Sequence, residues 1–138
     1  MGCVGVEYVE ALDVCVFRLT GTIVPDDIVE ASLSAAVLHP ALARLWDISE
    51  ASFDGWSEAL LRDVVGGLGP AAHSVPGLRV ALVSTNAEGA RICGIVKHLV
   101  AAHSFPVTVE VFSKRTSALA WLGVMHVPVG GVASATRT

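Results

Sequence analysis

The stretch from Leu78 to His103 constrains the fold of this chain more than any other part of the sequence. It opens with a short, nearly unbroken apolar run over residues 78–83, which is typical of a strand buried on both faces of a parallel sheet. A stripe at helical spacing follows and gives a helix one inward face; it consists of Ile92, Val96, Leu99, Val100 and His103. The stretch therefore predicts a strand–helix unit, with Thr85 and Glu88 as the capping box of the helix.

Four further runs rich in β-branched and aromatic residues predict four more strands. The first two, residues 4–9 and 14–19, are separated by only four residues, so a hairpin is the simplest interpretation. The other two cover residues 43–48 and 107–112. Gly21 is expected to end the second strand.

Helical patterns lie between these strands. Pro25 suits the first turn of a helix that runs to about Leu38, since Pro40 cannot continue it. Its predicted inward face consists of Ile28, Ala31, Ala35 and Leu38. Asp54 is the expected N-cap of a second helix, in which Trp56, Leu60 and Val64 recur at i, i+4 and i+8. Glycines end this helix, and a flexible connection through Pro76 and Gly77 leads to the next strand.

A last short helix is predicted over residues 114–122, capped by Ser113 and stopped by Gly123. The order β-β-α-β-α-β-α-β-α predicts a single α/β domain over residues 1–123 with right-handed crossovers. Its five-stranded sheet is expected to be mostly parallel, with the first strand antiparallel at an edge. Residues 124–138 are small and lack periodicity, so we expect a mobile C-terminal tail.

Composition excludes several classes of partner. The chain has 9 basic and 13 acidic residues, a net charge of −4 and no basic run, which argues against binding nucleic acid. It contains no apolar run near the roughly 20 residues of a membrane-spanning helix and no signal-peptide pattern, so a cytoplasmic protein is expected. Charged residues make up 16%, against roughly 25% in typical domains. This low fraction indicates apolar surface that a homodimer would cover.

Motifs for catalysis, cofactors and metals are missing from the sequence. Cys3, Cys15 and Cys93 form no CxxC pair and are expected to be reduced thiols, and the five histidines have no metal-ligand spacing. The chain has no GxSxG, Walker or GxGxxG motif. We therefore expect no catalytic residue, no cofactor and no metal, and hence a protein that is not an enzyme.

A response-regulator receiver is an alternative suggested by three positions at the carboxyl ends of predicted strands. These are Asp47, Ser84 or Thr85, and Lys114. A receiver also needs an acidic pair after its first strand to hold magnesium, and here Gly21 and Thr22 follow the second strand. The missing acidic pair and the order of strands and helices both argue against a receiver domain.

The order of elements resembles the SpoIIAA-like (STAS-type) family, and so do three motifs. These are Gly89-x-Arg91, Val111-Phe112 and the run Ala118-Leu119-Ala120-Trp121-Leu122-Gly123. The resemblance extends from about Val4 to Gly123 and implies a superhelix of βα units, a fold shared with the lipid-carrying CRAL-TRIO domains. The family includes anti-sigma-factor antagonists, transporter domains and bacterial proteins without an assigned activity, some suspected of binding lipids or membranes.

The segment that matches the phosphorylation site of the family departs from its pattern. In the anti-sigma antagonists a turn resembling Asp-Ser-Ser-Gly precedes the second helix, and the serine after the aspartate is phosphorylated. Here the segment is Asp54-Gly55-Trp56-Ser57, so Gly55 holds the acceptor position. Ser57 can in principle take a phosphate in the first turn of the helix, and capping that helix is its alternative role.

Two functional hypotheses remain, and both are non-enzymatic. The first is interaction with a protein partner, including self-association as a homodimer. The second is binding of a lipid or small hydrophobic ligand, with association at a membrane surface, in which the second helix moves to open a cavity next to the sheet. Arg91, near the free N–H groups of its helix, is a candidate for an anionic head group or a partner carboxylate, or else forms a surface salt bridge. The candidate ligand or partner residues are Phe53, Asp54, Trp56, Ser57, Leu60 and Arg91.

Overall fold

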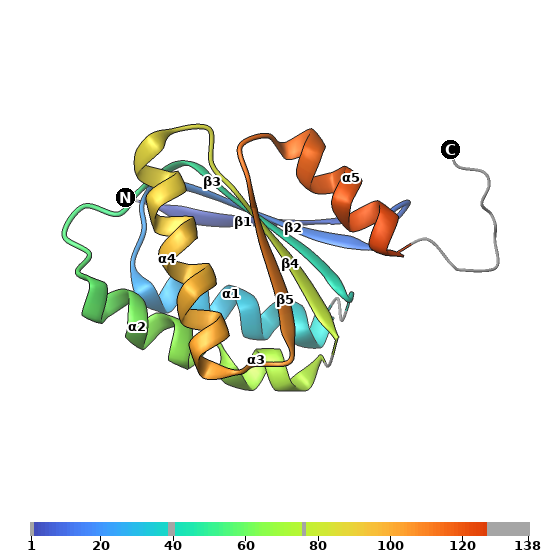
Figure 1. Cartoon of the computed structure of the whole chain (residues 1–138), viewed down its shortest axis with the longest axis horizontal. Helices are drawn as coiled ribbons and strands as arrows, with labels where there is room; N and C mark the ends of the chain where they lie inside the picture. The colour runs from blue at the N-terminus through green and yellow to red at the C-terminus, as the bar shows by residue number, and fades with distance from the viewer. Residues whose placement is uncertain (1, 39–40, 76, 127–138) are drawn as a thin grey trace.

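The computed structural model describes residues 2–38, 41–75 and 77–126. One five-stranded sheet has the order β1-β2-β3-β4-β5, with β1 antiparallel to β2 and the other neighbours parallel. The strands are β1 (Cys3–Val9), β2 (Val14–Thr22), β3 (Ala43–Ser52), β4 (Leu78–Val83) and β5 (Val107–Phe112). The helices are α1 (Pro25–Leu38), α2 (Glu58–Gly67), α3 (Gly69–Ser74), α4 (Ala87–His103) and α5 (Arg115–His126). The predicted α/β sheet with an antiparallel edge strand is confirmed (Figure 1).

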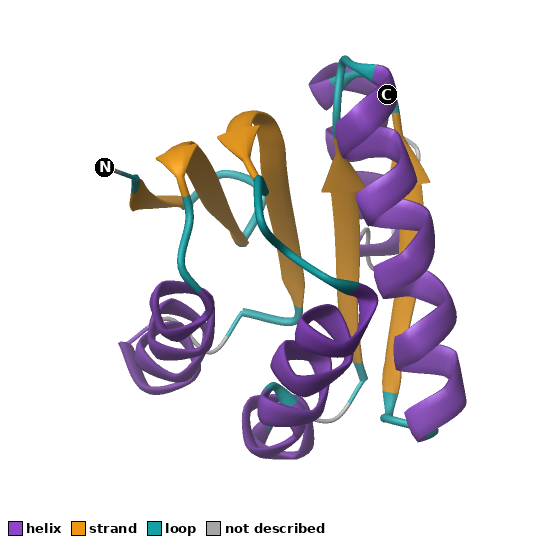
Figure 2. Ribbon diagram, turned by 90° about the vertical axis from the view of Figure 1, so that its left-hand side faces the viewer, coloured by secondary structure: helices purple, strands orange, loops and turns teal. Residues whose placement is uncertain are grey.

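One face of the sheet carries the larger of two apolar clusters. Phe17, Trp46 and Leu82 lie on three neighbouring strands and are paired in register, so their side chains share this face. The rings of Phe17 and Trp46 stack with centroids 4.0 Å apart. Helices α1, α2 and α4 lie side by side over this face (Figure 2). Because side chains alternate along a strand, every second residue of these strands points into the core on this face of the sheet.

The opposite face is covered by α5. Its buried residues Ala118 and Leu122 pack with Leu45 and Ala81 of the central strands. Figure 1 shows α5 on the side of the sheet away from α1 and α3. One helix therefore closes this smaller cluster.

An ion pair joins the first turn of α5 to the middle of β3. Arg115 Nη2 lies 3.0 Å from Asp47 Oδ2, and the backbone N–H of Ser49 donates to Asp47 Oδ1 at 3.0 Å. Burial works to raise the pKa of Asp47, but the hydrogen bonds from Ser49 and Arg115 and the Arg115 charge outweigh it, so the net pKa is lowered. Asp47 is thus a structural carboxylate rather than a receiver-type ligand.

Two predicted helix caps are wrong. Ser57, not Asp54, caps α2, and its hydroxyl accepts from the N–H of Leu60 at 3.1 Å. The chain turns first at Gly55, which has a φ of 83°, so the helix starts later. Asn86, not Thr85, caps α4 by accepting from Gly89 N at 2.7 Å. The Asn86 amide also donates to Ser49 O at 2.9 Å, a contact between distant segments that the sequence does not reveal.

Several predicted boundaries also differ from the structure. The connection expected to be flexible contains α3, because Pro70 suits a first helical turn and Ala71 and Ala72 are buried. Strand β3 runs to Ser52, since a register shift lets residues 50–52 pair with residues 20–22 of β2. Strand β2 continues beyond Gly21 for the same reason. Leu38 is 70% exposed and does not join the inward face of α1.

The last helix continues past Gly123 to His126, so the predicted stop at Gly123 is wrong. The side chain of Leu122 is fully buried in the smaller apolar cluster. Residues 127–138, which belong to the expected tail, lie outside the described part of the chain.

The lowered pKa of Asp47 predicts how the stability of the domain depends on pH. The stability that its charge contributes is fully present above the unfolded pKa of about 3.9 and is lost as the pH falls through the lower folded pKa. We expect Asp47→Asn to lower the free energy of unfolding at pH 7, and the difference from the wild type to shrink as the pH falls through the lowered folded pKa. Urea unfolding at pH 7 and in a series of acidic buffers measures this. Asp54→Asn, at an exposed carboxylate, is the control; equal effects of the two variants would contradict the prediction.

Candidate functional site

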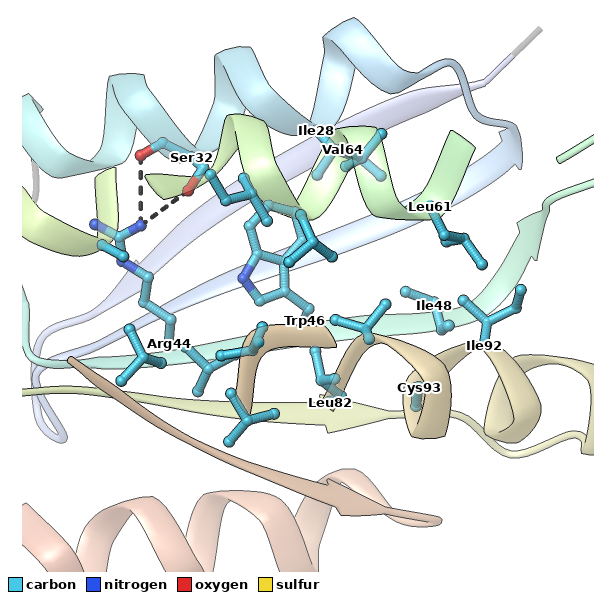
Figure 3. Close-up of a pocket in the computed structure, with 18 of the residues that line it drawn as sticks. Ile28, Ser32, Arg44, Trp46, Ile48, Leu61, Val64, Leu82, Ile92 and Cys93 are labelled. Atoms are coloured by element: carbon cyan, nitrogen blue, oxygen red, sulfur yellow. Dashed lines mark hydrogen bonds between the residues drawn. The ribbon is translucent and has the colours of Figure 1, made fainter. Parts of the chain in front are cut away.

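A cavity of about 120 Å³ lies between the sheet and the helices of its more heavily covered face. Its walls come from several strands and helices and are almost entirely apolar. Figure 3 shows the site, whose labelled apolar side chains include Ile28, Trp46, Ile48, Val64, Leu82 and Ile92. Such a void is unusual, because protein interiors are packed to crystal-like density with few holes larger than a water molecule.

One end of this cavity carries a charge. Arg44 lies on β3 two residues before Trp46, so the pleat directs it to the same face of the sheet as Trp46 and Ile48. Its side chain is 1% exposed. In Figure 3 the guanidinium lies at one end of the cavity, while Ile48 and Ile92 lie at the other.

The guanidinium of Arg44 is only partly satisfied by the protein. Nη1 donates to the carbonyl and hydroxyl oxygens of Ser32 on α1, at 3.4 and 3.3 Å. Nε and Nη2 are buried and have no hydrogen-bond partner within the described part of the chain. A buried donor left unpaired costs about 1–3 kcal/mol, and a charged one costs more. This arrangement therefore works against folding stability.

The charge on Arg44 is not balanced by an acidic residue in the described cavity wall. Burial lowers the pKa of Arg44, but a guanidinium remains protonated near neutral pH. Among the described residues that line the cavity, none is Asp or Glu. The guanidinium carbon lies 5.9 Å from the centroid of the Phe17 ring, a contact that offsets part of the desolvation. The cavity thus combines an apolar body with one cationic end.

Two of the residues predicted from the sequence line this cavity. Phe53 is buried and Trp56 half-buried, and their rings meet edge to face with centroids 5.1 Å apart. The indole Nε1 of Trp56 donates to Ile23 O at 3.0 Å, which fixes the connection between β3 and α2. Both aromatic residues therefore belong to the wall at the start of α2.

The other predicted residues lie elsewhere. Asp54 is exposed, the Ser57 hydroxyl caps α2, and the half-buried Leu60 is not part of the cavity wall. Arg91 is exposed and pairs with Glu88 on its own helix at 2.9 Å. The structure therefore does not bring these four residues together with Phe53 and Trp56.

The glycine of the Gly89-x-Arg91 motif has a packing role. A Cβ at Gly89 would lie 2.0 Å from the hydroxyl of the buried Ser84, at the end of β4. Only glycine therefore lets the first turn of α4 approach the sheet this closely.

Sequence reasoning missed Arg44 and Ser32. The available signal was period-two alternation in the third strand, which places a charged residue on the same face as Trp46 and Ile48. Ser32 sits on the inward side of α1 beside Ala31 and Ala35, and it is 5% exposed. Neither residue stands in a recognisable motif.

The described part of the chain offers neither a metal site nor a membrane span. Within residues 2–38, 41–75 and 77–126, no three His, Cys, Asp or Glu side chains come together as metal ligands. In the same ranges no helix combines the length and apolarity needed to cross a bilayer.

A solved structure resembles this arrangement of strands and helices. It is the crystal structure of an uncharacterized protein of the DUF3478 family with a SpoIIAA-like fold, from Shewanella loihica PV-4. The two chains share 20% sequence identity, with a TM-score of 0.56, over 88% of this chain and 93% of the other. The chain has the SpoIIAA-like fold. No family model matches the sequence, and neither does any curated protein. The likeness concerns the SpoIIAA-like fold alone.

The burial of two of the three cysteines predicts how fast each thiol reacts. Cys93 lines the cavity and is 1% exposed, and burial together with the Asp47 charge raises its pKa to about 12. Burial also raises the pKa of Cys15, whereas Cys3 is exposed. At pH 8 we expect 5,5′-dithiobis(2-nitrobenzoate) to modify one thiol rapidly and the other two only after unfolding, because thiolates are the reactive form.

The control for this measurement is Cys3→Ser, which should remove the rapid phase completely. Rapid modification of a second thiol in the folded protein would contradict the burial of Cys93 and Cys15.

Proposed function

We propose that this SpoIIAA-like domain binds a small apolar molecule in the cavity beneath α1, α2 and α4. The observation that carries the proposal is an apolar cavity of about 120 Å³ between the sheet and its helices, since protein interiors usually hold few voids larger than a water molecule. An engineered apolar cavity of roughly 150 Å³ stays dry and takes up benzene, so a hollow of this order suits one ring or a short alkyl chain.

The character of the wall supports binding rather than catalysis. Aromatic side chains from three places in the chain, Trp46, Trp56 and Phe105, provide flat contact surface for an apolar ligand. Cys93 remains a neutral thiol because its pKa is about 12, and the Ser32 hydroxyl is bonded to Arg44. Among the described lining residues no nucleophile is paired with a general base. A non-enzymatic carrier or sensor of small molecules is the role we propose.

Filling the cavity tests this role. Toluene should raise the melting temperature of the wild type, because a ligand that binds only the folded state stabilises it. Val64→Phe places extra volume in the cavity and should remove the shift, while Val37→Phe makes the same change at a position that is 79% exposed and should preserve it. Ala72→Val is a gentler filling if Val64→Phe overpacks the core. Equal toluene shifts in all four proteins would contradict the proposal.

Self-association is a second candidate, favoured by the sheet edge at β1. In the described sheet this edge strand pairs with β2 alone, and its Val6 and Tyr8 are 46% and 37% exposed. Leu33, Val37 and Leu38 on the neighbouring α1 are also exposed. A second copy that pairs along β1 would cover this apolar surface and complete the backbone hydrogen bonding of the edge.

A charge on the edge strand tests this second candidate. We expect Val6→Lys to shift the protein toward monomer, because a lysine at a strand edge blocks pairing with another strand. Sedimentation velocity over a range of protein concentrations measures the shift. Ser117→Lys, on the exposed side of α5, is the matched control and should leave the association unchanged. A wild type that stays monomeric at millimolar concentration would contradict self-association.

A further inference from the structure

We infer that the ligand is a small monocarboxylate, with its apolar body in the cavity and its carboxylate on the guanidinium of Arg44. This inference rests on the proposed binding function and adds the chemical class of the ligand. The apolar body would have roughly six carbons, the size of the benzene that a comparable cavity admits.

The first argument is charge. Arg44 is 1% exposed, and the described lining residues include no carboxylate to neutralise it. Within the described chain its guanidinium donates to the neutral Ser32 alone, at distances of 3.3 and 3.4 Å. Buried charges in proteins are normally paired, because desolvation of an isolated ion is costly. An anionic ligand would supply the missing charge.

The second argument is geometry. Nη1 is engaged by Ser32, whereas Nε and Nη2 are the two nitrogens that lack a partner among the described residues. These two nitrogens share one edge of the planar guanidinium and present two parallel N–H bonds. A carboxylate accepts two such bonds side by side, which is the strongest arrangement of this pair. Ser32 thus orients the group and leaves its carboxylate-binding edge without a partner among the described residues. Both nitrogens of this edge are fully buried, so a carboxylate binds there when the adjoining side chains move aside.

The third argument concerns size and polarity. The cavity holds about 120 Å³, which is small against the roughly 300–1,000 Å³ of common ligand pockets, so a phospholipid does not fit. Beyond Arg44 and Ser32, the polar side-chain groups of the described wall are one thiol and the indole N–H groups of Trp46 and Trp56, and the Trp56 N–H already donates to Ile23 O. The three charged oxygens of a phosphate would therefore meet few donors and one cation. A single carboxylate attached to a short alkyl chain or one ring meets both limits.

Calorimetric titration with hexanoate and its neutral analogue hexanamide tests this assignment on the full chain. The wild type should bind hexanoate saturably, and Arg44→Met should weaken that binding at least about tenfold, the loss of hydrogen bonds to a charged group. Hexanamide should bind both proteins alike. Arg44→Lys keeps the charge but loses the paired N–H edge, so its hexanoate affinity should lie between the other two.

A stability measurement separates ligand binding from a purely structural role of Arg44. Without ligand, Arg44→Met should melt at the same temperature as the wild type or higher, because an apolar replacement removes an uncompensated buried charge. A clear loss of stability would overturn the inference and assign Arg44 to joining α1 and β3. If Arg44→Met fails to fold, that outcome also overturns it.

The same titrations keep the inference distinct from the proposed function. Equal binding of hexanoate and hexanamide to the wild type would overturn the carboxylate and leave the apolar cavity standing. Toluene shifts that respond to Val64→Phe, together with no binding of hexanoate, would likewise overturn the carboxylate alone. Absence of binding by toluene, hexanamide and hexanoate alike would overturn both.

Discussion

The packing of α1, α2 and α4 against the apolar face of β2, β3 and β4 is the interaction on which the rest of this structure depends. It buries the stacked pair of Phe17 and Trp46, which the strand register brings together, and forms the layer of core around them. Burial of apolar area is the dominant favourable term in folding and is not directional, so it fixes the layer without filling every position within it. The cavity lies between this face of the sheet and the helices that cover it, whose arrangement Figure 2 shows.

This packing also buries the charged side chain of Arg44, which lowers the stability of the fold. The same pleat that brings Trp46 and Ile48 into the core also brings a guanidinium there, two residues before Trp46. Ser32 of α1 satisfies part of it, and two nitrogens remain without a protein partner in the described chain. Local features that oppose stability are often found at binding sites, where a ligand later compensates for them. The buried charge and the adjacent hollow support one another as evidence for a single site.

The SpoIIAA-like fold by itself does not select a function for this chain. The similar structure from Shewanella loihica PV-4 shares the arrangement of strands and helices at 20% identity, and folds of this kind host unrelated roles. Within the described residues, the features that carry the two proposals are the buried cation of Arg44, the apolar wall of the cavity, and the exposed Val6 and Tyr8 of the edge strand. The proposed ligand binding uses the face of the sheet covered by α1, α2 and α4, whereas the proposed self-association uses the edge at β1.

The sequence by itself determined the order of the described strands and of the described helices other than α3, the mostly parallel sheet and the antiparallel edge. The hydrophobic pattern of a segment is a local property: residues 78–83 form a nearly unbroken apolar run and residues 107–112 alternate, and both patterns predict strands. Phe53 and Trp56 were also identified as candidate wall residues, because paired aromatic residues beside a turn are visible in the sequence.

Only the tertiary structure decided the caps, the helix α3, the full length of β3 and the role of Arg44. Asn86 caps α4 while bonding Ser49, and Arg44 of β3 meets Ser32 of α1 across twelve residues of chain. A hollow is the volume that side chains from distant segments leave empty, and a charge is unpaired only relative to those same side chains. Neither quantity exists until the helices and the sheet have come together.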